Sequence, residues 1–222
     1  MTQALAPYPK EYFITRFYGA DKARSQMYKQ ERARILAYKQ RGAVLDVGCG
    51  MGDFLAGFSD QWRKFGIEPS KYAAGEAFRH GIEIIPDIAD MGVKSVDLVI
   101  YRGTIQHIDE PFVSIKKSIA ALKEDGLLVF LATPNADSIC YRLWGDLPAL
   151  DPERNFWIPS ARTLTNAMAN LGMTVIRIEY PYRATPYAKP LHDLGCFIGR
   201  LFGRRAKFAW PGNMMEVYAV KG

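Results

Sequence analysis

The chain has 222 residues, of which 49% are hydrophobic, and its formal net charge is +6 at pH 7. This length suits one complete α/β domain, and the hydrophobic share supports a sizeable core and excludes wholesale disorder. The sequence shows neither a signal-peptide pattern nor an apolar run long enough for a membrane span, so we expect a cytoplasmic protein. The scattered cysteines and histidines lack metal-ligand spacing, so we expect no metal site.

The positive charge gathers in two stretches. One basic stretch begins after Asp193 and contains no acidic residue before Glu216. The other basic stretch lies near the N-terminus. We expect its basic residues to occupy a solvent-exposed helix face: Lys22, Arg24, Lys29, Arg32 and Arg34. In neither stretch do basic and aromatic residues alternate as in a single-strand binding groove, so we expect no nucleic-acid partner.

In chain order, the apolar pattern predicts a helix over residues 20–40, followed by short apolar runs that alternate with helical segments. Strands are predicted at 43–47, 62–67, 82–85, 96–101 and 127–132, and again at 173–180 and 214–220. Between them, helices are predicted at 111–122, where Pro111 suits a first turn, and from Ser160 to Leu171. Apolar strands separated by helices indicate a parallel sheet covered on both faces, which the two late strands would close with an antiparallel edge.

No linker-like segment divides the chain, so we expect a single domain over residues 1–222. We divide it into an N-terminal helical lid (1–42), a cofactor-binding core (43–135), an acceptor-side insertion (136–160) and a C-terminal helix with strands (161–222). The last part contains an amphipathic insertion near 190–203.

A glycine-rich turn follows the first predicted strand, from Asp46 to Gly52. Glycines there let the backbone approach a ligand. A dinucleotide fingerprint would need a glycine where Asp53 stands, and the Gly-Lys-Ser/Thr ending of a phosphate loop is missing. Acids at both ends of the turn would repel a pyrophosphate and suit a cationic ligand. S-adenosylmethionine, with a sulfonium and an ammonium group, is such a ligand.

Carboxylates also end the next two predicted strands. Glu68, about 20 residues beyond the glycine turn, is placed to accept both hydroxyls of a ribose. Asp87 is placed to accept an adenine amino proton, and Ile88 to flank the ring. Because the carboxyl ends of parallel strands meet at one edge of a sheet, these residues predict an S-adenosylmethionine site.

Five stretches between residues 43 and 173 carry a wider resemblance: VLDVGCGMGDFL, FGIEPSKYAAGEAFRHGIE, VDLVIYRGTIQHIDEP, LKEDGLLVFLATPNADS and LDPERNFWIPSARTLTNAMANLGM. The set resembles class I S-adenosylmethionine-dependent methyltransferases, in the bacterial small-molecule branch related to ubiquinone-biosynthesis and sugar methyltransferases. The resemblance implies a Rossmann-like, doubly wound α/β sheet of seven strands, mostly parallel with an antiparallel late strand and helices on both faces. It also implies cofactor contacts from Asp46, Gly48, Gly50, Glu68, Asp87, Ile88, Tyr101 and Ile105.

The chain departs from these relatives on the acceptor side. Gln106 stands where a glutamate often precedes the retained His107, and both histidines usual around position 155 are missing, with Asn155 in their place. A non-catalytic cofactor-binding partner or regulatory subunit is therefore one alternative, and a tRNA or protein methyltransferase is another.

Methyl transfer to a hydroxyl needs alignment, exclusion of water and a nearby base. His107 is the candidate base; alternatively its ring packs against the glycine turn or bonds to backbone. Arg102 would orient an anionic substrate or form a surface ion pair, and Asn135 would hold a polar group or make a turn. Asn155 and Trp157 are further candidate substrate contacts. Aromatic residues outside the predicted sheet would roof the pocket: Tyr8, Tyr12, Phe13, Tyr18, Tyr141, Trp144, Phe156 and Trp157.

From Pro190 the sequence predicts an amphipathic helix with His192, Asp193 and Arg200 on its polar side. Its apolar side comprises Leu191, Leu194, Phe197, Ile198, Leu201 and Phe202. We expect this helix to pack on its own domain; the alternative is docking on an anionic membrane or admission of a lipid-linked substrate. Taken together, the sequence predicts a methyltransferase that acts on a small-molecule or glycan-like acceptor, free or lipid-linked, at oxygen.

Overall fold

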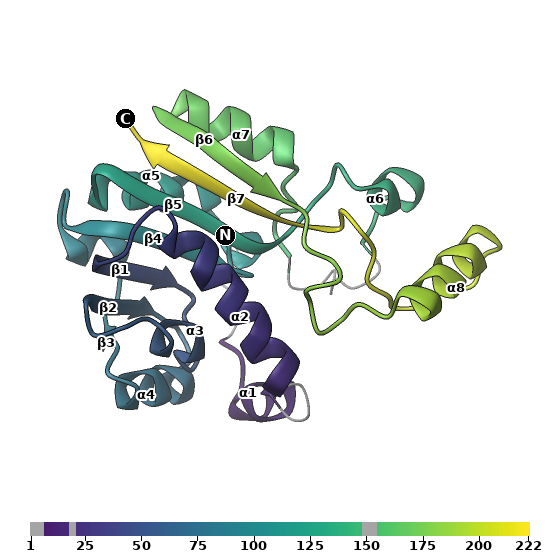
Figure 1. Cartoon of the computed structure of the whole chain (residues 1–222), viewed down its shortest axis with the longest axis horizontal. Helices are drawn as coiled ribbons and strands as arrows, with labels where there is room; N and C mark the ends of the chain where they lie inside the picture. The colour runs from purple at the N-terminus through teal and green to yellow at the C-terminus, as the bar shows by residue number, and fades with distance from the viewer. Residues whose placement is uncertain (1–6, 18–20, 148–154) are drawn as a thin grey trace.

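The computed structural model describes residues 7–17, 21–147 and 155–222 (Figure 1). Its centre is a seven-stranded sheet with the strand order β3-β2-β1-β4-β5-β7-β6. The strands are β1 (Gly42–Val47), β2 (Trp62–Ile67), β3 (Glu83–Ile84), β4 (Val96–Arg102), β5 (Leu122–Pro134), β6 (Met173–Glu179) and β7 (Met214–Lys221). All seven predicted strands are present, and the order reverses between β1 and β4, as in a doubly wound sheet.

The direction of the last two strands refines the prediction. Strands β1 to β5 pair in parallel, whereas β7 is antiparallel to both of its neighbours, β5 and β6. The mostly parallel sheet with an antiparallel late strand is confirmed. The expected closure of the sheet by the two late strands is also present: β7 is antiparallel to β5, and β6, the edge strand, is antiparallel to β7. Strand β7 lies between β5 and β6, and its backbone N–H and C=O groups form hydrogen bonds with those of both strands.

Helices cover both faces of the sheet, as predicted. One face carries α5 (Pro111–Ala121) and α7 (Ala161–Asn170). The other carries α2 (Asp21–Leu36), α3 (Asp53–Ala56) and α4 (Lys71–Arg79). Along β4, Val99 and Tyr101 point to the first face and Leu98 and Ile100 to the second, all at 0% exposure. A strand buried on both sides explains why its sequence is continuously apolar.

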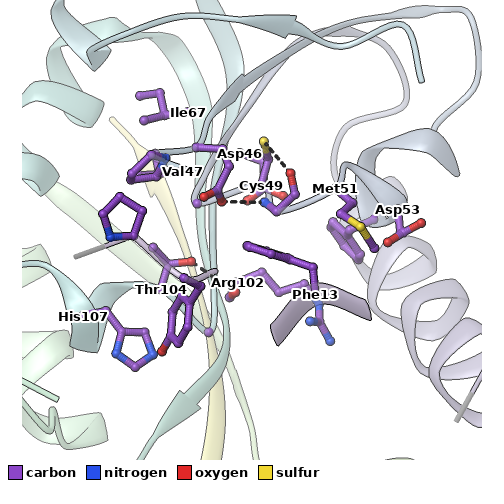
Figure 2. A pocket seen from close by; sticks show the side chains of 18 of the residues that line it. Phe13, Asp46, Val47, Cys49, Met51, Asp53, Ile67, Arg102, Thr104 and His107 are labelled. Carbon is purple, nitrogen blue, oxygen red and sulfur yellow. Dashed lines mark hydrogen bonds between the residues drawn. The ribbon is translucent and has the colours of Figure 1, made fainter. Parts of the chain in front are cut away.

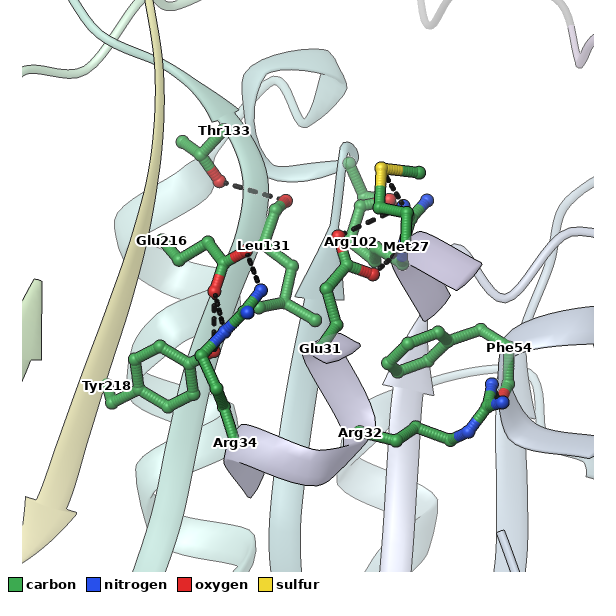
Figure 3. A network of polar contacts seen from close by, with 11 residues as sticks. Met27, Glu31, Arg32, Arg34, Phe54, Arg102, Leu131, Thr133, Glu216 and Tyr218 are labelled. Carbon is green, nitrogen blue, oxygen red and sulfur yellow. Dashed lines mark hydrogen bonds and ion pairs between the residues drawn. The ribbon is translucent and has the colours of Figure 1, made fainter. Parts of the chain in front are cut away.

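Helix α2 overturns one expectation. Its lysines are exposed, but its three arginines, Arg24, Arg32 and Arg34, turn toward the body of the protein. Arg32 donates a hydrogen bond to the carbonyl oxygen of Phe54 (3.1 Å). Arg34 forms two hydrogen bonds with the fully buried carboxylate of Glu216 on β7, at 2.9 and 2.6 Å (Figure 3). The arginines of α2, which we expected to face solvent, therefore make polar contacts with the body of the protein instead.

Three further helices lie beyond the sheet: α1 (Lys10–Phe17), α6 (Ile139–Trp144) and α8 (Pro190–Leu201). Helix α8 extends away from the sheet, beyond α6 (Figure 1). Two 3-10 helices, η1 (Ile88–Met91) and η2 (Ile105–His107), follow β3 and β4. Among the described helices, none has the length and apolar character needed to cross a membrane.

Candidate active site

A cavity of about 350 Å³ lies at the carboxyl ends of β1, β2 and β4, and Tyr12 and Phe13 of α1 also line it (Figure 2). This volume lies within the usual range for a small-molecule site. Its floor is the turn after β1, and its far end is formed by the segment Arg102–His107 after β4. The structure thus brings together Asp46, Gly48, Gly50, Glu68, Arg102 and His107 from the predicted site residues.

The glycine turn needs its glycines for two different reasons. Gly48 and Gly50 have φ angles of +79° and +57°, which L-residues with side chains rarely adopt. A Cβ on Gly48 would also lie 2.5 Å from the side chain of Thr104, so the close contact between the turns after β1 and β4 requires a glycine. A Cβ on Gly50 would meet only the ring of Phe13, at 3.9 Å. Its backbone is therefore open to the cavity.

Asp46 is a buried acid at the end of β1. Its side chain is 2% exposed, and Oδ1 has no hydrogen-bond partner among the described residues. Burial raises the pKa of Asp46 to about 7; Arg102 opposes this increase and Glu68 adds to it. A buried carboxylate oxygen without a partner, at the wall of a cavity, suits a cationic ligand, which would supply both the charge and the hydrogen bond.

Glu68 connects the glycine turn to the start of α4. Its two carboxylate oxygens accept hydrogen bonds from the backbone N–H of Gly50 (3.0 Å) and of Ser70 (2.8 Å). Burial raises the pKa of Glu68, and these two hydrogen bonds partly offset the increase. The side chain lines this cavity and also an adjoining one of about 350 Å³ that Ile84 and Pro86 share. Each oxygen retains a lone pair for a ligand hydroxyl.

Asp87 and Ile88 lie just beyond the second cavity, after Pro86. The Asp87 carboxylate caps η1 by accepting the backbone N–H of Ala89 (2.8 Å), and it pairs with the ammonium of Lys117 (2.9 Å). Ile88 is 5% exposed and belongs to the core between the sheet and α5. Both residues thus adjoin the predicted adenine position without lining either cavity.

Tyr101 and Ile105 are fully buried behind the cavity wall. The Tyr101 hydroxyl is 2.7 Å from the hydroxyls of Ser114 and Ser118 on α5, and its ring stacks on Phe130 with centroids 5.4 Å apart. Neither residue lines the cavity. Their packing fixes the end of β4 and the start of η2, and it thereby holds the segment that carries Arg102 and His107.

For Arg102 we expected either a contact with an anionic substrate or a surface ion pair; the structure shows an ion pair, but a buried one. Its guanidinium donates two hydrogen bonds to Glu31 of α2, at 2.8 and 3.2 Å (Figure 3). The guanidinium lies 4.2 Å from the ring centre of Tyr28 and 5.5 Å from that of Phe54. The exposed fractions of the two paired side chains are 11% and 2%. Arg102 is thus a buried cation, held in place by α2, at the wall of the cavity.

His107 lies at the end of the cavity away from Met51 and Asp53, below Thr104 (Figure 2). The side-chain amide of Gln106 is 3.2 Å from its Nε2, and the ring of Tyr8 meets its ring edge-on, with centroids 6.3 Å apart. The imidazole therefore faces the part of the cavity that α1 and the segment before it enclose.

Of the aromatic residues expected to roof the pocket, Tyr8, Tyr12 and Phe13 of the N-terminal segment line the cavity. Tyr8 and Tyr12 stack with centroids 3.9 Å apart, and Phe13 is 5% exposed above the glycine turn. Tyr18 lies outside the described residues. Tyr141 and Trp144 belong to a separate apolar cluster with Cys140, Leu147 and Phe208.

The remaining candidates flank the cavity. Asn135 donates to the carbonyl of Gly212 (2.9 Å) and accepts the N–H of Asp137 (3.0 Å), so it stabilises a turn. The segment 155–157 lies beside η2, because Phe156 and Trp157 donate their backbone N–H to the carbonyl of Gln106. Thus the two positions at which the chain departs from its relatives, Gln106 and Asn155, are neighbours in space. Among the described residues, no group of three potential metal ligands occurs.

Sequence reasoning missed the contribution of α2 to this site. Tyr28 lines the cavity and Glu31 fixes Arg102, although both stand in a stretch that seemed solvent-exposed. Tyr28 and Glu31 are three residues apart, so they lie on the same side of the helix. This spacing is the one sequence signal that could have linked them.

The chain is similar to known proteins over most of its sequence and in its fold. Residues 20–178 match the family described as "Methyltransferase domain". A structure from Thermotoga maritima, described as a SAM-dependent methyltransferase and possible histamine N-methyltransferase, is 17% identical, covering 96% of this chain and 97% of that one, with a TM-score of 0.63. A SAM-dependent methyltransferase from Archaeoglobus fulgidus is 16% identical, with coverages of 95% and 99% and a TM-score of 0.67.

A further structure is a putative methyltransferase of Haloferax volcanii in complex with the Trm112 methyltransferase activator. It is 13% identical, covering 97% of this chain and 98% of that one, with a TM-score of 0.70. At such identities the likeness shows the fold alone. No curated protein matches the chain significantly in sequence. The match over more than half of the chain, together with the fold and the site, shows that this protein belongs to the methyltransferase-domain family and is a methyltransferase with S-adenosylmethionine as its cofactor.

Proposed function

We propose that the enzyme transfers a methyl group to a hydroxyl oxygen of a small-molecule or glycan-like acceptor, free or lipid-linked. The observation that carries this proposal is the position of His107, which lines the cavity at the end away from Met51 and Asp53. An imidazole there is placed to take the proton that a hydroxyl loses as it is methylated. The enclosed volume below α1 favours a small acceptor group. We place the enzyme in the cytoplasm, with peripheral contact to a membrane surface.

The cofactor would be held by residues at both ends of the glycine turn. We infer that the Asp46 carboxylate binds the cationic amino-acid end and that Glu68 accepts the two ribose hydroxyls. The unpartnered Oδ1 of Asp46 and the position of Glu68 between the two cavities support this orientation. The adenine would then lie toward the second cavity, near Pro86, with Asp87 and Ile88 beyond it.

When bound, S-adenosylmethionine supplies an activated methyl group on a positively charged sulfur. The contribution of the chain is to align the acceptor oxygen with that methyl group and to exclude water. Phe13 and the stacked pair of Tyr8 and Tyr12 close the cavity from above. His107 would accept the hydroxyl proton as the acceptor oxygen takes the methyl group and the methyl–sulfur bond breaks, which leaves S-adenosylhomocysteine, and His107 would later release that proton to solvent.

The proposed reaction is tested in two steps. Calorimetry with S-adenosylmethionine and S-adenosylhomocysteine is expected to show binding of both. The enzyme is then incubated with cell extract and cofactor that carries a deuterated methyl group, and the labelled product is analysed by mass spectrometry. We expect the label on a hydroxyl oxygen of a small molecule or glycan. A label found on nitrogen, on carbon, on tRNA or on protein would overturn the proposed acceptor.

Replacing His107 with alanine is expected to lower the turnover rate about 100-fold, the usual contribution of a general base. Affinity for S-adenosylmethionine should stay within about twofold, because His107 lies at the end of the cavity away from Met51 and Asp53 and is not among the residues proposed to hold the cofactor. Steady-state kinetics with the identified acceptor and calorimetry measure the two effects. Added imidazole should restore part of the rate of His107→Ala, which a purely structural role would not allow. Unchanged turnover would remove His107 from the mechanism.

Cofactor affinity is expected to increase with pH because of Asp46. Its pKa of about 7 leaves the carboxyl group largely protonated at pH 6 and largely ionised at pH 7.5. A cationic ligand binds the ionised form, so the dissociation constant should fall by roughly fivefold to tenfold over this range. Calorimetry at several pH values measures it, with Asp46→Asn as the control that lacks the titration. An equal pH dependence in both proteins would show that another group is responsible.

A further inference from the structure

Helix α8 presents its apolar side to solvent. At about 100° per residue, Leu191, Leu194, Ile198 and Leu201 fall on one side of the helix. Their exposed fractions are 88%, 47%, 46% and 54%, and Phe202, directly after the helix, is 83% exposed. We call these five residues the α8 apolar face. Such a concentration of exposed large apolar side chains is typical of a binding surface.

The polar side of α8 makes the contacts with the rest of the protein. Asp193 is 1% exposed and accepts hydrogen bonds from the Tyr182 hydroxyl (2.8 Å) and the Lys189 N–H (2.7 Å). Arg200 donates to both carboxylate oxygens of Asp146, at 2.6 and 2.7 Å. The helix therefore packs on its own domain as expected, but in the opposite orientation, because its charged residues are the ones that face inward.

One aromatic contact fixes the rotation of the helix. Phe197, at the border between the two sides, stacks on Trp210 with ring centroids 4.1 Å apart and lies 5.2 Å from the ring of Trp144. Rotating α8 to bury its apolar face would break this stack, the Asp193 hydrogen bonds and the Arg200 ion pair together. These contacts together therefore hold the α8 apolar face toward solvent.

The surroundings of the α8 apolar face are basic. Between residues 180 and 215 the single acidic residue is Asp193, which is buried and hydrogen-bonded. Five exposed basic residues lie in the same stretch, and none of them forms an ion pair with another described residue: Arg183, Lys189, Arg204, Arg205 and Lys207. An apolar stripe beside unpaired positive charges complements an anionic bilayer surface.

We propose that the α8 apolar face docks onto an anionic lipid bilayer, with its apolar side chains at the boundary between headgroups and acyl chains. Two features favour a bilayer over a second copy of this chain. A second copy would bring the same positive charges together across the interface. The α8 apolar face comprises five side chains on and directly after a single 12-residue helix, whereas a stable interface buries about 800 Å² per partner, contributed by about 20–30 residues on each side.

Docking would orient the active site. The segment that contains α8 leaves the sheet at the carboxyl end of β6 and rejoins it at the start of β7. There Met214 pairs with Pro134 at the end of β5. The cavity opens at the same edge of the sheet. That edge would therefore face the bilayer, which suits an acceptor carried on a lipid. This consequence rests on the proposed function, whereas the docking itself does not.

The test uses the full chain and two kinds of vesicle in a co-sedimentation assay. Wild-type protein is expected to bind vesicles that contain phosphatidylglycerol and to bind pure phosphatidylcholine vesicles at least tenfold more weakly. Leu194→Ser/Ile198→Ser and Arg204→Glu/Arg205→Glu should each lose at least tenfold in binding. The matched controls are Phe78→Ser, which removes an exposed aromatic residue of α4 (71% exposed), and Arg41→Glu, which reverses an exposed charge before β1. Both controls should bind like wild type.

Three results would overturn the proposal: no binding to either vesicle, equal binding by the α8 variants and wild type, or a wild-type dimer that Leu194→Ser/Ile198→Ser converts to monomer. Since the substituted side chains are exposed, all variants should retain the wild-type circular dichroism spectrum and cofactor affinity. Vesicle binding is measured without an acceptor, so its failure is distinguishable from failure of the proposed reaction.

Discussion

Replacing Glu68 with alanine is expected to weaken the binding of S-adenosylmethionine about 100-fold. In the proposed orientation the carboxylate accepts two ribose hydroxyls, and hydrogen bonds to a charged group contribute about 1.5–3 kcal/mol each. The substitution also removes the acceptor of the backbone N–H groups of Gly50 and Ser70, which loosens the glycine turn. Isothermal titration calorimetry at pH 7.5 measures the effect.

Two variants separate the role of Glu68 from its charge alone. Glu68→Gln keeps the shape and one acceptor oxygen, so we expect a loss of about tenfold, between wild type and alanine. Glu83→Gln removes the same charge on β3, where the Glu83 side chain is 63% exposed. It should leave the affinity for S-adenosylmethionine unchanged. A dissociation constant of Glu68→Ala within threefold of wild type would contradict the proposed orientation of the cofactor.

Replacing Glu31 with alanine is expected to lower the free energy of unfolding by about 3–5 kcal/mol. Arg102 is 11% exposed and Glu31 2% exposed, so removal of the carboxylate leaves a buried guanidinium without its counter-charge. Desolvation of an unpaired charge is the largest cost that a single substitution can impose at this place in the protein. Urea unfolding followed by circular dichroism measures the change.

The matched control is a surface ion pair. Glu124→Ala removes the partner of Lys94 in a pair whose side chains are 59% and 57% exposed, so we expect no measurable change in stability. The double variant Glu31→Met/Arg102→Met removes both charges of the pair and should recover most of the loss, because neither partner is left buried without the other. A loss below about 1 kcal/mol in Glu31→Ala would show that solvent reaches Arg102.

Most of the sheet, and the meeting of the glycine turn and Glu68 at one cavity, could be predicted from sequence because their signals are local. Strands such as β1 and β4 are buried on both faces, so their residues are continuously apolar and their limits are visible in the chain. The glycine turn and Glu68 follow directly at strand ends, and parallel strands bring such ends to one edge. Periodicity, turn residues and the position of charges at strand ends were therefore sufficient.

What the sequence alone determined is the set of elements, their type and the residues at the ends of the parallel strands. The tertiary structure alone decided which buried side chains meet. Arg34 and Glu216 stand 182 positions apart, and Arg102 and Glu31 stand 71 apart, and no local pattern pairs such residues. The orientation of α8 is the clearest case. Its amphipathic period is the same whichever side packs inward, and contacts from Tyr182, Asp146 and Trp210 turn its apolar face outward.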